Sequence, residues 1–408
     1  MKYRKTLRIF FSLTAAVAFQ TCAFAQTSRP TLPRVFSLNA KTLQLNKQKL
    51  TETKNGDPSL KPALAKLERD AQKALTVEIL PVTAKTALPP SGNKHDYMSQ
   101  APYFWKNPDT KNGLPYIRKD GERNPEIKNF PDHESMNLLA LTVERLATAY
   151  YFTGKEEYAA RAAVLLRMWF LDPRTQMNPN LEFAQAVPGV NDGRGIGILE
   201  SRVLTRVVDG VGLINGSKAW TTADQSGLTA WFSKYYDWLT TSKHGKDEAG
   251  AKNNHGTWYD VQTTSFALFI GKTDDAKKIL KAAKQKRIAA QIDVDGRLPL
   301  ELARTNSWGY SAMNLDGLTR LADLGDLVAV DLWNYQTSDG RGIRKAIEFL
   351  YPFANGSKKW TTQQIDEFLP EKLYLVMRRA ATHYRDDKFK AMTVPAVEAK
   401  DRTQILGN

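Results

Sequence analysis

Two short clusters of polar residues have the side-chain types that acid–base chemistry on a charged substrate requires. The first is Asn253-Asn254-His255, with Trp258 three positions further on, where a loop is expected to enter a helix. A helix N-terminus exposes unpaired N–H groups and a partial positive charge, so amides and an imidazole there favour a bound carboxylate. The structural alternative is that Asn254 is an ordinary N-cap and His255 the first helical residue.

The second cluster lies at the end of the segment 295–310, where Arg304 stands six residues before Tyr310. This spacing does not by itself put the two side chains on one helical face. A turn at residues 306–309 would bring both into one cleft. The structural alternative is a surface arginine and a core tyrosine.

Together these motifs resemble those of the alginate lyase family of polysaccharide lyases. Asn253-Asn254-His255-x-x-Trp258 matches the family signature, and Arg304 and Tyr310 stand where the second motif is expected. The resemblance extends from about residue 95 to residue 350 and includes the segments 94–98 and 331–333. It implies a helical toroid whose cleft holds four catalytic candidates, namely Asn254, His255, Arg304 and Tyr310.

The chain departs from the best-known mannuronate-cleaving branch of that family at two points. The interval between Arg304 and Tyr310 differs by about a residue, and Gly256-Thr257 inside the first motif differs as well. The expected substrate is therefore a uronate polymer, alginate or polymannuronate first. Preference for mannuronate, guluronate or glucuronate, and cleavage within chains or at their ends, stay open.

β-Elimination explains why these residue types are needed. The charge of the uronate carboxylate must be offset so that the C5 proton can leave, a role that suits Asn254 aided by His255 or Arg304. Tyr310 is the candidate that protonates the departing O4. The base is Tyr310 in a syn elimination, if Arg304 lowers its pKa, or His255 in an anti elimination. The scheme needs no cofactor and no metal, and the histidines lack zinc-type spacing.

Further residues are candidates for binding the sugar acid. Aromatic side chains in the loop before residue 131 can stack on sugar rings, and cationic ones can contact carboxylates. The candidates from both groups, with two from the first motif, are Lys94, His95, Tyr97, Tyr103, Trp105, Arg194, Asn253 and Trp258. Three other histidines are expected to be structural or exposed, namely His133, His244 and His383.

The composition of the N-terminal segment indicates the compartment in which the protein acts. The first 25 residues carry four basic and no acidic residues, an apolar run and Ala23-Phe24-Ala25, which together indicate a signal peptide cleaved after Ala25. The apolar run is too short for a membrane span of about 20 residues, so no stable membrane insertion is expected. Cys22, the only cysteine, lies in this segment, which excludes thiol chemistry from the mature chain.

The remaining charge favours a polyanionic partner. The whole chain has a formal charge of +15, so removal of the signal leaves 15 − 4 = +11. Export and the lack of a dense Lys/Arg run argue against nucleic acid and for an anionic polysaccharide in the periplasm or outside the cell. The oligomeric state is open.

The elements that must position these residues are predicted to be helices. Apolar residues recur at helical spacing, and alternating strand patterns are nearly absent, so we expect an all-α, α/α toroid of antiparallel helix pairs over residues 60–400. Residues 26–59 are expected to be irregular and 81–131 a long loop. The expected helices span 132–152, about 158–169, 196–214, about 228–238, 255–270, 274–292, 310–330, 341–350 and 362–384.

Two other classes of function remain as alternatives at this point. A glycoside hydrolase would use a carboxyl pair, with Asp96, Asp260 and Glu301 as candidates. An exported polysaccharide-binding protein would have the same fold without chemistry. Ultraviolet absorbance separates the first case, since only a lyase makes a conjugated unsaturated uronate.

Overall fold

The computed structural model describes Met1, residues 32–51, residues 57–386, Phe389 and residues 404–407. The chain from Pro33 onward forms one compact unit, and Met1–Leu32 is a separate one. Apart from Met1, the predicted signal peptide and its cleavage point lie outside the described residues.

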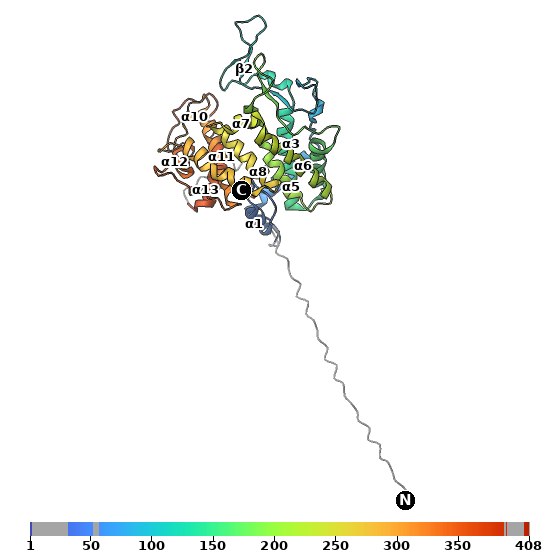
Figure 1. Cartoon of the computed structure of the whole chain (residues 1–408). Coiled ribbons are helices and arrows are strands. Elements are labelled where there is room, and N and C mark those ends of the chain that lie inside the picture. The colour runs from blue at the N-terminus through green and yellow to red at the C-terminus, as the bar shows by residue number, and fades with distance from the viewer. Residues whose placement is uncertain (2–31, 52–56, 387–388, 390–403, 408) are drawn as a thin grey trace. The chain divides into compact units, whose positions relative to one another are not determined.

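The compact unit is an all-α toroid of paired helices (Figure 1). Its longer helices are α1 (Ala40–Thr51), α2 (Lys61–Ala74), α3 (Asp132–Thr153), α4 (Glu156–Leu166), α5 (Leu204–Ile214), α6 (Thr222–Thr241), α8 (Asn254–Phe269), α9 (Thr273–Ala283), α11 (Ser307–Asp326), α12 (Ile343–Ala354) and α13 (Tyr374–Tyr384). The shorter helices among the described residues are α7 (Lys243–Ala249), α10 (Pro299–Leu302) and α16 (Gln404–Gly407). Short turns join α3 to α4 and α8 to α9, so these neighbours pack as antiparallel pairs. The predicted fold class is confirmed.

Helix α8 lies at the centre of these contacts. It packs against α5, α6, α7, α9 and α11. Of its residues only His255 is not buried. Because α8 is buried on nearly all sides, its polar side chains are distributed around the helix and satisfied by internal partners rather than gathered on one solvent face, as for Asp260 with Arg287 and Gln262 with Ser201. The fold therefore places His255 at the start of α8, as the residue of that helix with the most exposed surface.

The few strands are short. Strand β1 (Met98–Gln100) pairs in parallel with β4 (Phe183–Ala186). Strand β2 (Phe104–Trp105) pairs with β3 (Ile117–Arg118) as an antiparallel hairpin, which extends away from the helices in Figure 1. The stretch 81–131, which was predicted to be a long loop, also contains the 3₁₀ turns η1 (Val82–Ala84) and η2 (Pro125–Asn129).

Helix boundaries were predictable where a breaker follows the apolar pattern. Gly154 ends α3 with a positive φ of 71°, a conformation that favours glycine. Several predicted helices change type within their span. Residues 195–203 form the 3₁₀ helix η4 (Gly195–Val203) before α5, and α4 and α9 each continue into a π turn, η3 (Arg167–Leu171) and η5 (Lys284–Ala289) respectively.

Two predictions of local structure were wrong. The described part of the supposedly irregular segment 26–59 includes helix α1, which buries Leu43 and contacts α16. The predicted helix 362–384 begins only at the 3₁₀ turn η6 (Pro370–Leu373), followed by α13. The stretch before it is extended because Gln364 forms a β-bridge with Asn306.

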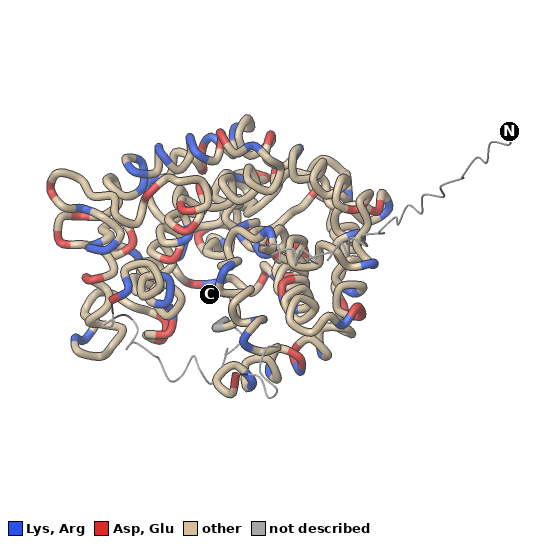
Figure 2. The backbone as a smooth tube through the Cα atoms, turned by 90° about the horizontal axis from the view of Figure 1, so that it is seen from below, with Lys and Arg blue, Asp and Glu red and all other residues tan. Residues whose placement is uncertain are grey.

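Charge is spread over the described part of the chain. Basic and acidic residues are interspersed along most of the helices in Figure 2, and the basic stretch 277–287 on α9 and η5 is an exception. No helix in that part is both long and apolar enough to cross a lipid bilayer.

Candidate functional site

Two adjoining cavities lie where α8 and α11 meet η4 and the β2–β3 hairpin. The larger, which we call the His255 chamber, has a volume of about 1080 Å³. The smaller, which we call the Trp258 chamber, has a volume of about 610 Å³. Four residues line both chambers and so mark their junction, namely Tyr103, Arg202, Tyr310 and Met313.

The imidazole of His255 is oriented by a buried carboxylate. Its Nδ1 lies 2.7 Å from Oε1 of Glu248, whose side chain is only 2% exposed. A proton on Nδ1 donates to that carboxylate, which leaves Nε2 with a lone pair on the chamber side. The N-cap of α8 is Asn253, which accepts the N–H of His255 at 3.2 Å, so the alternative that assigned the cap to Asn254 is wrong.

Asn254 lies behind the chamber wall. It has no exposed surface, and Glu301 accepts both its backbone N–H at 2.6 Å and its Nδ2 at 2.8 Å. Glu301 also accepts Nδ2 of Asn314, and burial raises its pKa. Oδ1 of Asn254 has no hydrogen-bond partner among the described residues. In this structure Asn254 has no exposed surface and is hydrogen-bonded to Glu301 at the start of α8, and its predicted direct role stays a prediction.

Arg304 and Tyr310 come together as the second motif requires. Nη2 of Arg304 donates to the Tyr310 hydroxyl at 2.9 Å, and the guanidinium lies 3.9 Å from the centre of the ring. Asp120 holds Arg304 through two hydrogen bonds of 2.7 and 3.1 Å. Both Arg304 and Tyr310 line the His255 chamber, so His255, Arg304 and Tyr310 share one cavity.

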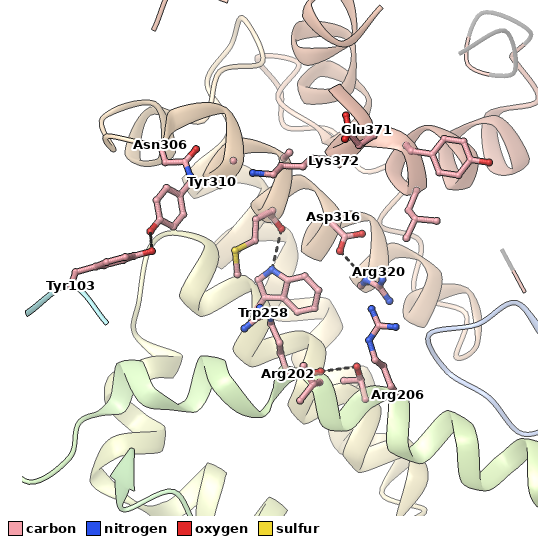
Figure 3. A pocket seen from close by; sticks show the side chains of 17 residues that line it. Tyr103, Arg202, Arg206, Trp258, Asn306, Tyr310, Asp316, Arg320, Glu371 and Lys372 are labelled. Carbon is pink, nitrogen blue, oxygen red and sulfur yellow. Dashed lines mark hydrogen bonds and ion pairs between the residues drawn. The ribbon is translucent and has the colours of Figure 1, made fainter. Parts of the chain in front are cut away.

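The hydroxyl of Tyr310 is held in its protonated form. Burial, followed by the hydrogen bond to Tyr103, raises the pKa of Tyr310, and these effects outweigh the opposing charge of Arg304. Arg304 does act to lower this pKa, but the net shift is upward, so the condition set for Tyr310 as the base is not met in this structure. The Tyr310 hydroxyl donates to the Tyr103 hydroxyl at 2.9 Å (Figure 3).

Arg194 and Tyr103 line the His255 chamber as predicted binding candidates. Arg194 donates to the carbonyl oxygen and to Oε1 of Gln185, at 3.1 and 2.9 Å, and lies over the ring of Phe104. Burial lowers the pKa of Arg194. Gln185 has a positive φ of 51°, an uncommon conformation for a residue other than glycine, and it turns both acceptors toward the guanidinium.

Other binding candidates do not line either chamber. Tyr97 is fully buried and donates its hydroxyl to Glu200 at 2.7 Å, so its ring cannot stack on a sugar. Trp105 lies on the other side of β2 from Phe104, which lines the His255 chamber, because side chains alternate along a strand. Lys94 is exposed on a turn, and Nδ1 of His95 lies 2.6 Å from the carbonyl oxygen of Gln176.

The remaining candidates lie as follows. Asn253 lines the His255 chamber, and Trp258 lines the smaller one while its Nε1 donates to the carbonyl oxygen of Met313. His133 lines the His255 chamber although the sequence marked it as structural or exposed. The carboxyl candidates for a hydrolase, Asp96, Asp260 and Glu301, line neither chamber.

The residues that sequence reasoning missed are mostly partners of those it found. Glu248, Asp120 and Gln185 orient His255, Arg304 and Arg194 respectively. Asp120 is 184 positions from Arg304, and no local pattern signals such a contact. Arg202 was also missed, although it lines both chambers.

Comparison with known proteins identifies the family. Residues 81–360 match the family model described as alginate lyase. An alginate lyase from Bacteroides ovatus of known crystal structure is 38% identical, with a TM-score of 0.84 over 88% of this chain and 94% of that one. Nothing among curated proteins matches.

More distant structures share the fold. Alginate lyase A1-III from Sphingomonas species A1 is 16% identical, with a TM-score of 0.54 over 90% of this chain and 95% of that one. A variant of A1-III solved in complex with a tetrasaccharide gives a TM-score of 0.55 at 16% identity, over 93% of this chain and 97% of that one. On the family match and the 38% identity over nearly the whole chain, this protein belongs to the alginate lyase family of polysaccharide lyases.

Proposed function

We propose that this lyase cleaves alginate, or a closely related uronate polymer, by metal-independent β-elimination. The observation that carries the proposal is that His255, Arg304 and Tyr310 line one chamber, with Arg304 bonded to the Tyr310 hydroxyl. The name of the Bacteroides ovatus relative supports alginate as the polymer. The excess of basic residues in the chain supports an acidic substrate.

In the proposed reaction, His255 removes the C5 proton through Nε2, and Glu248 stabilises the imidazolium that forms. The C5–H electron pair becomes the C4–C5 double bond as the C4–O4 bond breaks. Tyr310 then protonates O4, a role that its raised pKa favours because the hydroxyl is protonated at neutral pH. Arg304 offsets the negative charge that builds up on the uronate carboxylate.

A second assignment uses Tyr310 as both base and acid. It requires a tyrosinate, which burial of the Tyr310 hydroxyl opposes. The first assignment is therefore the one that this geometry supports better. Substitution of His255 tests the first assignment, since elimination that survives in His255→Gln would exclude His255 as the base.

The test is a panel of purified alginate, polymannuronate, polyguluronate and polyglucuronate followed by ultraviolet absorbance of the unsaturated product. We expect absorbance to grow with at least one polymer, and Tyr310→Phe to reduce kcat by about 10²–10⁴-fold while polymer binding persists. Tyr335→Phe is the matched control, because its hydroxyl meets only the exposed Gln285 side chain at 2.7 Å among described partners. Bond cleavage without new absorbance would contradict elimination.

Dialysis against a chelator tests the metal-independent part of the proposal. The charge-offsetting groups proposed here belong to the protein, so activity is expected to persist unchanged. Loss of activity that is restored by one divalent cation would contradict this part alone.

We also propose that the chain is exported and loses residues 1–25. The support is the basic start, the short apolar run and Ala23-Phe24-Ala25. Sequencing the N-terminus of the secreted or periplasmic protein is expected to give Gln26. An exported protein that still contained residue 2 would contradict the proposed removal of residues 1–25.

A further inference from the structure

The Trp258 chamber continues the cleft beyond Tyr310. Figure 3 shows the hydroxyls of Tyr103 and Tyr310 meeting at one end of it and Arg206 and Arg320 at the other, while Arg202 lies at the junction with the His255 chamber. Because Tyr310 borders both chambers, a polymer that places its reacting bond at Tyr310 from the His255 chamber has this second cavity on the far side of that bond.

The Trp258 chamber carries an excess of cationic groups. Its lining includes four cations, Arg202, Arg206, Arg320 and Lys372, and two carboxylates, Asp316 and Glu371. Asp316 is already engaged, since it accepts hydrogen bonds from Arg320 and Arg379. The two carboxylates of this lining therefore do not neutralise all four cations.

Arg202 stands out among these cations. Its Nη1 donates to the carbonyl oxygen of Leu199 at 3.0 Å, and no carboxylate pairs with it in the part of the chain that the structure describes. Arg206, by contrast, forms an ion pair with Glu144. Burial lowers the pKa of Arg202, and the charges of Glu200 and Asp316 oppose this shift without forming an ion pair with the guanidinium. Such a group favours an anionic ligand that enters the chamber.

Lys372 reaches the same cavity from the opposite wall. It lies on η6, beyond the residues that the family model matches, and its side chain is exposed. Figure 3 shows its ammonium extending toward the space between Tyr310 and Trp258. The two walls thus present one half-buried and one exposed cation to the same space.

We propose that the Trp258 chamber is a second uronate subsite, in which Arg202 and Lys372 bind the carboxylate of a sugar on the far side of the reacting bond from the His255 chamber. This inference rests on the proposed uronate substrate. It adds that the chain holds polymer on both sides of Tyr310 and therefore favours cleavage within chains. Trp258 forms part of the wall against which that sugar packs.

The test measures kcat/KM by ultraviolet absorbance on uronate oligomers of increasing length and on polymer. Arg202→Gln and Lys372→Gln are compared with Arg174→Gln, which removes the same charge from an exposed side chain paired with Asp172. We expect kcat/KM on polymer to fall about 10-fold, mainly through KM, for each chamber variant and not for the control. The shortest oligomer that the wild type cleaves is expected to lose much less.

The outcomes separate the two proposals. Equal loss on all lengths, or no loss with Lys372→Gln, overturns the subsite while wild-type elimination still supports the proposed function. Absence of elimination by the wild type on every uronate polymer overturns the proposed function, and the subsite with it. Lys372 is exposed, so its substitution tests the subsite even if Arg202→Gln lowers stability.

Discussion

At the scale of single residues, the contact between His255 and Glu248 sets the chemistry that the imidazole can do. Glu248→Gln keeps the shape of the acceptor but removes the charge that stabilises a protonated ring. We expect kcat to fall roughly 10- to 100-fold, a large part of what a general base contributes. The measurement is steady-state elimination on polymer.

A matched control is available for this substitution. Glu182→Gln makes the same change beside His244, whose Nε2 lies 3.5 Å from the Glu182 carboxylate. Glu182 is half exposed, and neither residue lines a chamber. The control is expected to keep wild-type kcat. If Glu248→Gln did so too, the charge of Glu248 would contribute nothing to the action of His255.

Asp120 holds Arg304 against Tyr310, and its removal tests whether that placement matters. The hydrogen bond from Arg304 keeps the pKa of Asp120 well below its ordinary value, so the ion pair is intact at every pH at which the enzyme is expected to work. Asp120→Asn is expected to reduce kcat/KM about 10-fold, mainly through kcat, because Arg304 loses its anchor.

Asp172→Asn is the control for Asp120→Asn, because it breaks a similar paired contact to the exposed Arg174. It is expected to leave kinetics unchanged. An effect of Asp120→Asn on KM alone would show that Arg304 binds the ground state and contributes nothing further to the transition state.

The sequence identified the groups that carry charge or protons but not the groups that hold them. His255, Arg304 and Tyr310 follow from residue type and motif. The contacts to Glu248 on α7, to Asp120 after β3 and to Glu301 on α10 depend on how three separate segments of the chain meet, and the buried Asn254 is hydrogen-bonded to Glu301. Periodicity and spacing contain no information on such distant pairings.

At the scale of elements, the turn between Arg304 and Tyr310 is clamped by an extended segment near the C-terminal end. Gln364 accepts the N–H of the buried Trp308 at 2.9 Å and donates to Oδ1 of Asn306 at 2.6 Å. Gln364→Ala is expected to cost about 1–3 kcal/mol in free energy of unfolding, because the Trp308 N–H loses its acceptor.

The same substitution is expected to lower kcat several-fold, since the start of α11 carries Tyr310. Gln363→Ala is the control, because Gln363 serves this clamp through its backbone oxygen and its side chain is exposed. Denaturant unfolding and kinetics on the same preparations provide the comparison. Loss of stability with unchanged kcat would show that the clamp supports the fold only.

This clamp also shows why one element was mispredicted. Residues 362–369 have no helix breaker before Pro370, so the pattern extended the final helix backward. The bridge between Gln364 and Asn306 holds the stretch extended instead, and Trp308 packs against Trp360 and Phe368 beneath it. Tertiary pairing overrides local preference here, whereas α3 and α8 obeyed it because each is a long buried helix.

At the scale of the whole molecule, a buried carboxylate ties the start of the compact unit to its core. Asp209 on α5 has no exposed surface and accepts the backbone N–H groups of Phe36, Ser37 and Leu38 at 2.6 to 3.2 Å. Burial raises the pKa of Asp209 to about 7, although those N–H groups oppose the shift. The folded chain therefore holds a proton there that the unfolded chain releases near pH 4.

This difference makes stability depend on pH in a direction that can be checked. Because the folded state binds the extra proton, the free energy of unfolding falls as pH rises from about 4 to about 7 and levels off above that, with a slope from this group of up to about 1.4 kcal/mol per pH unit. Urea unfolding at pH 5, 6, 7 and 8 is expected to show a shallower fall for Asp209→Asn than for the wild type. The exposed Asp237, paired with Lys272, provides the control substitution Asp237→Asn, which is expected to follow the wild-type profile. Parallel profiles for the wild type and Asp209→Asn would show that Asp209 is already ionised in the folded chain and that its three N–H donors outweigh its burial.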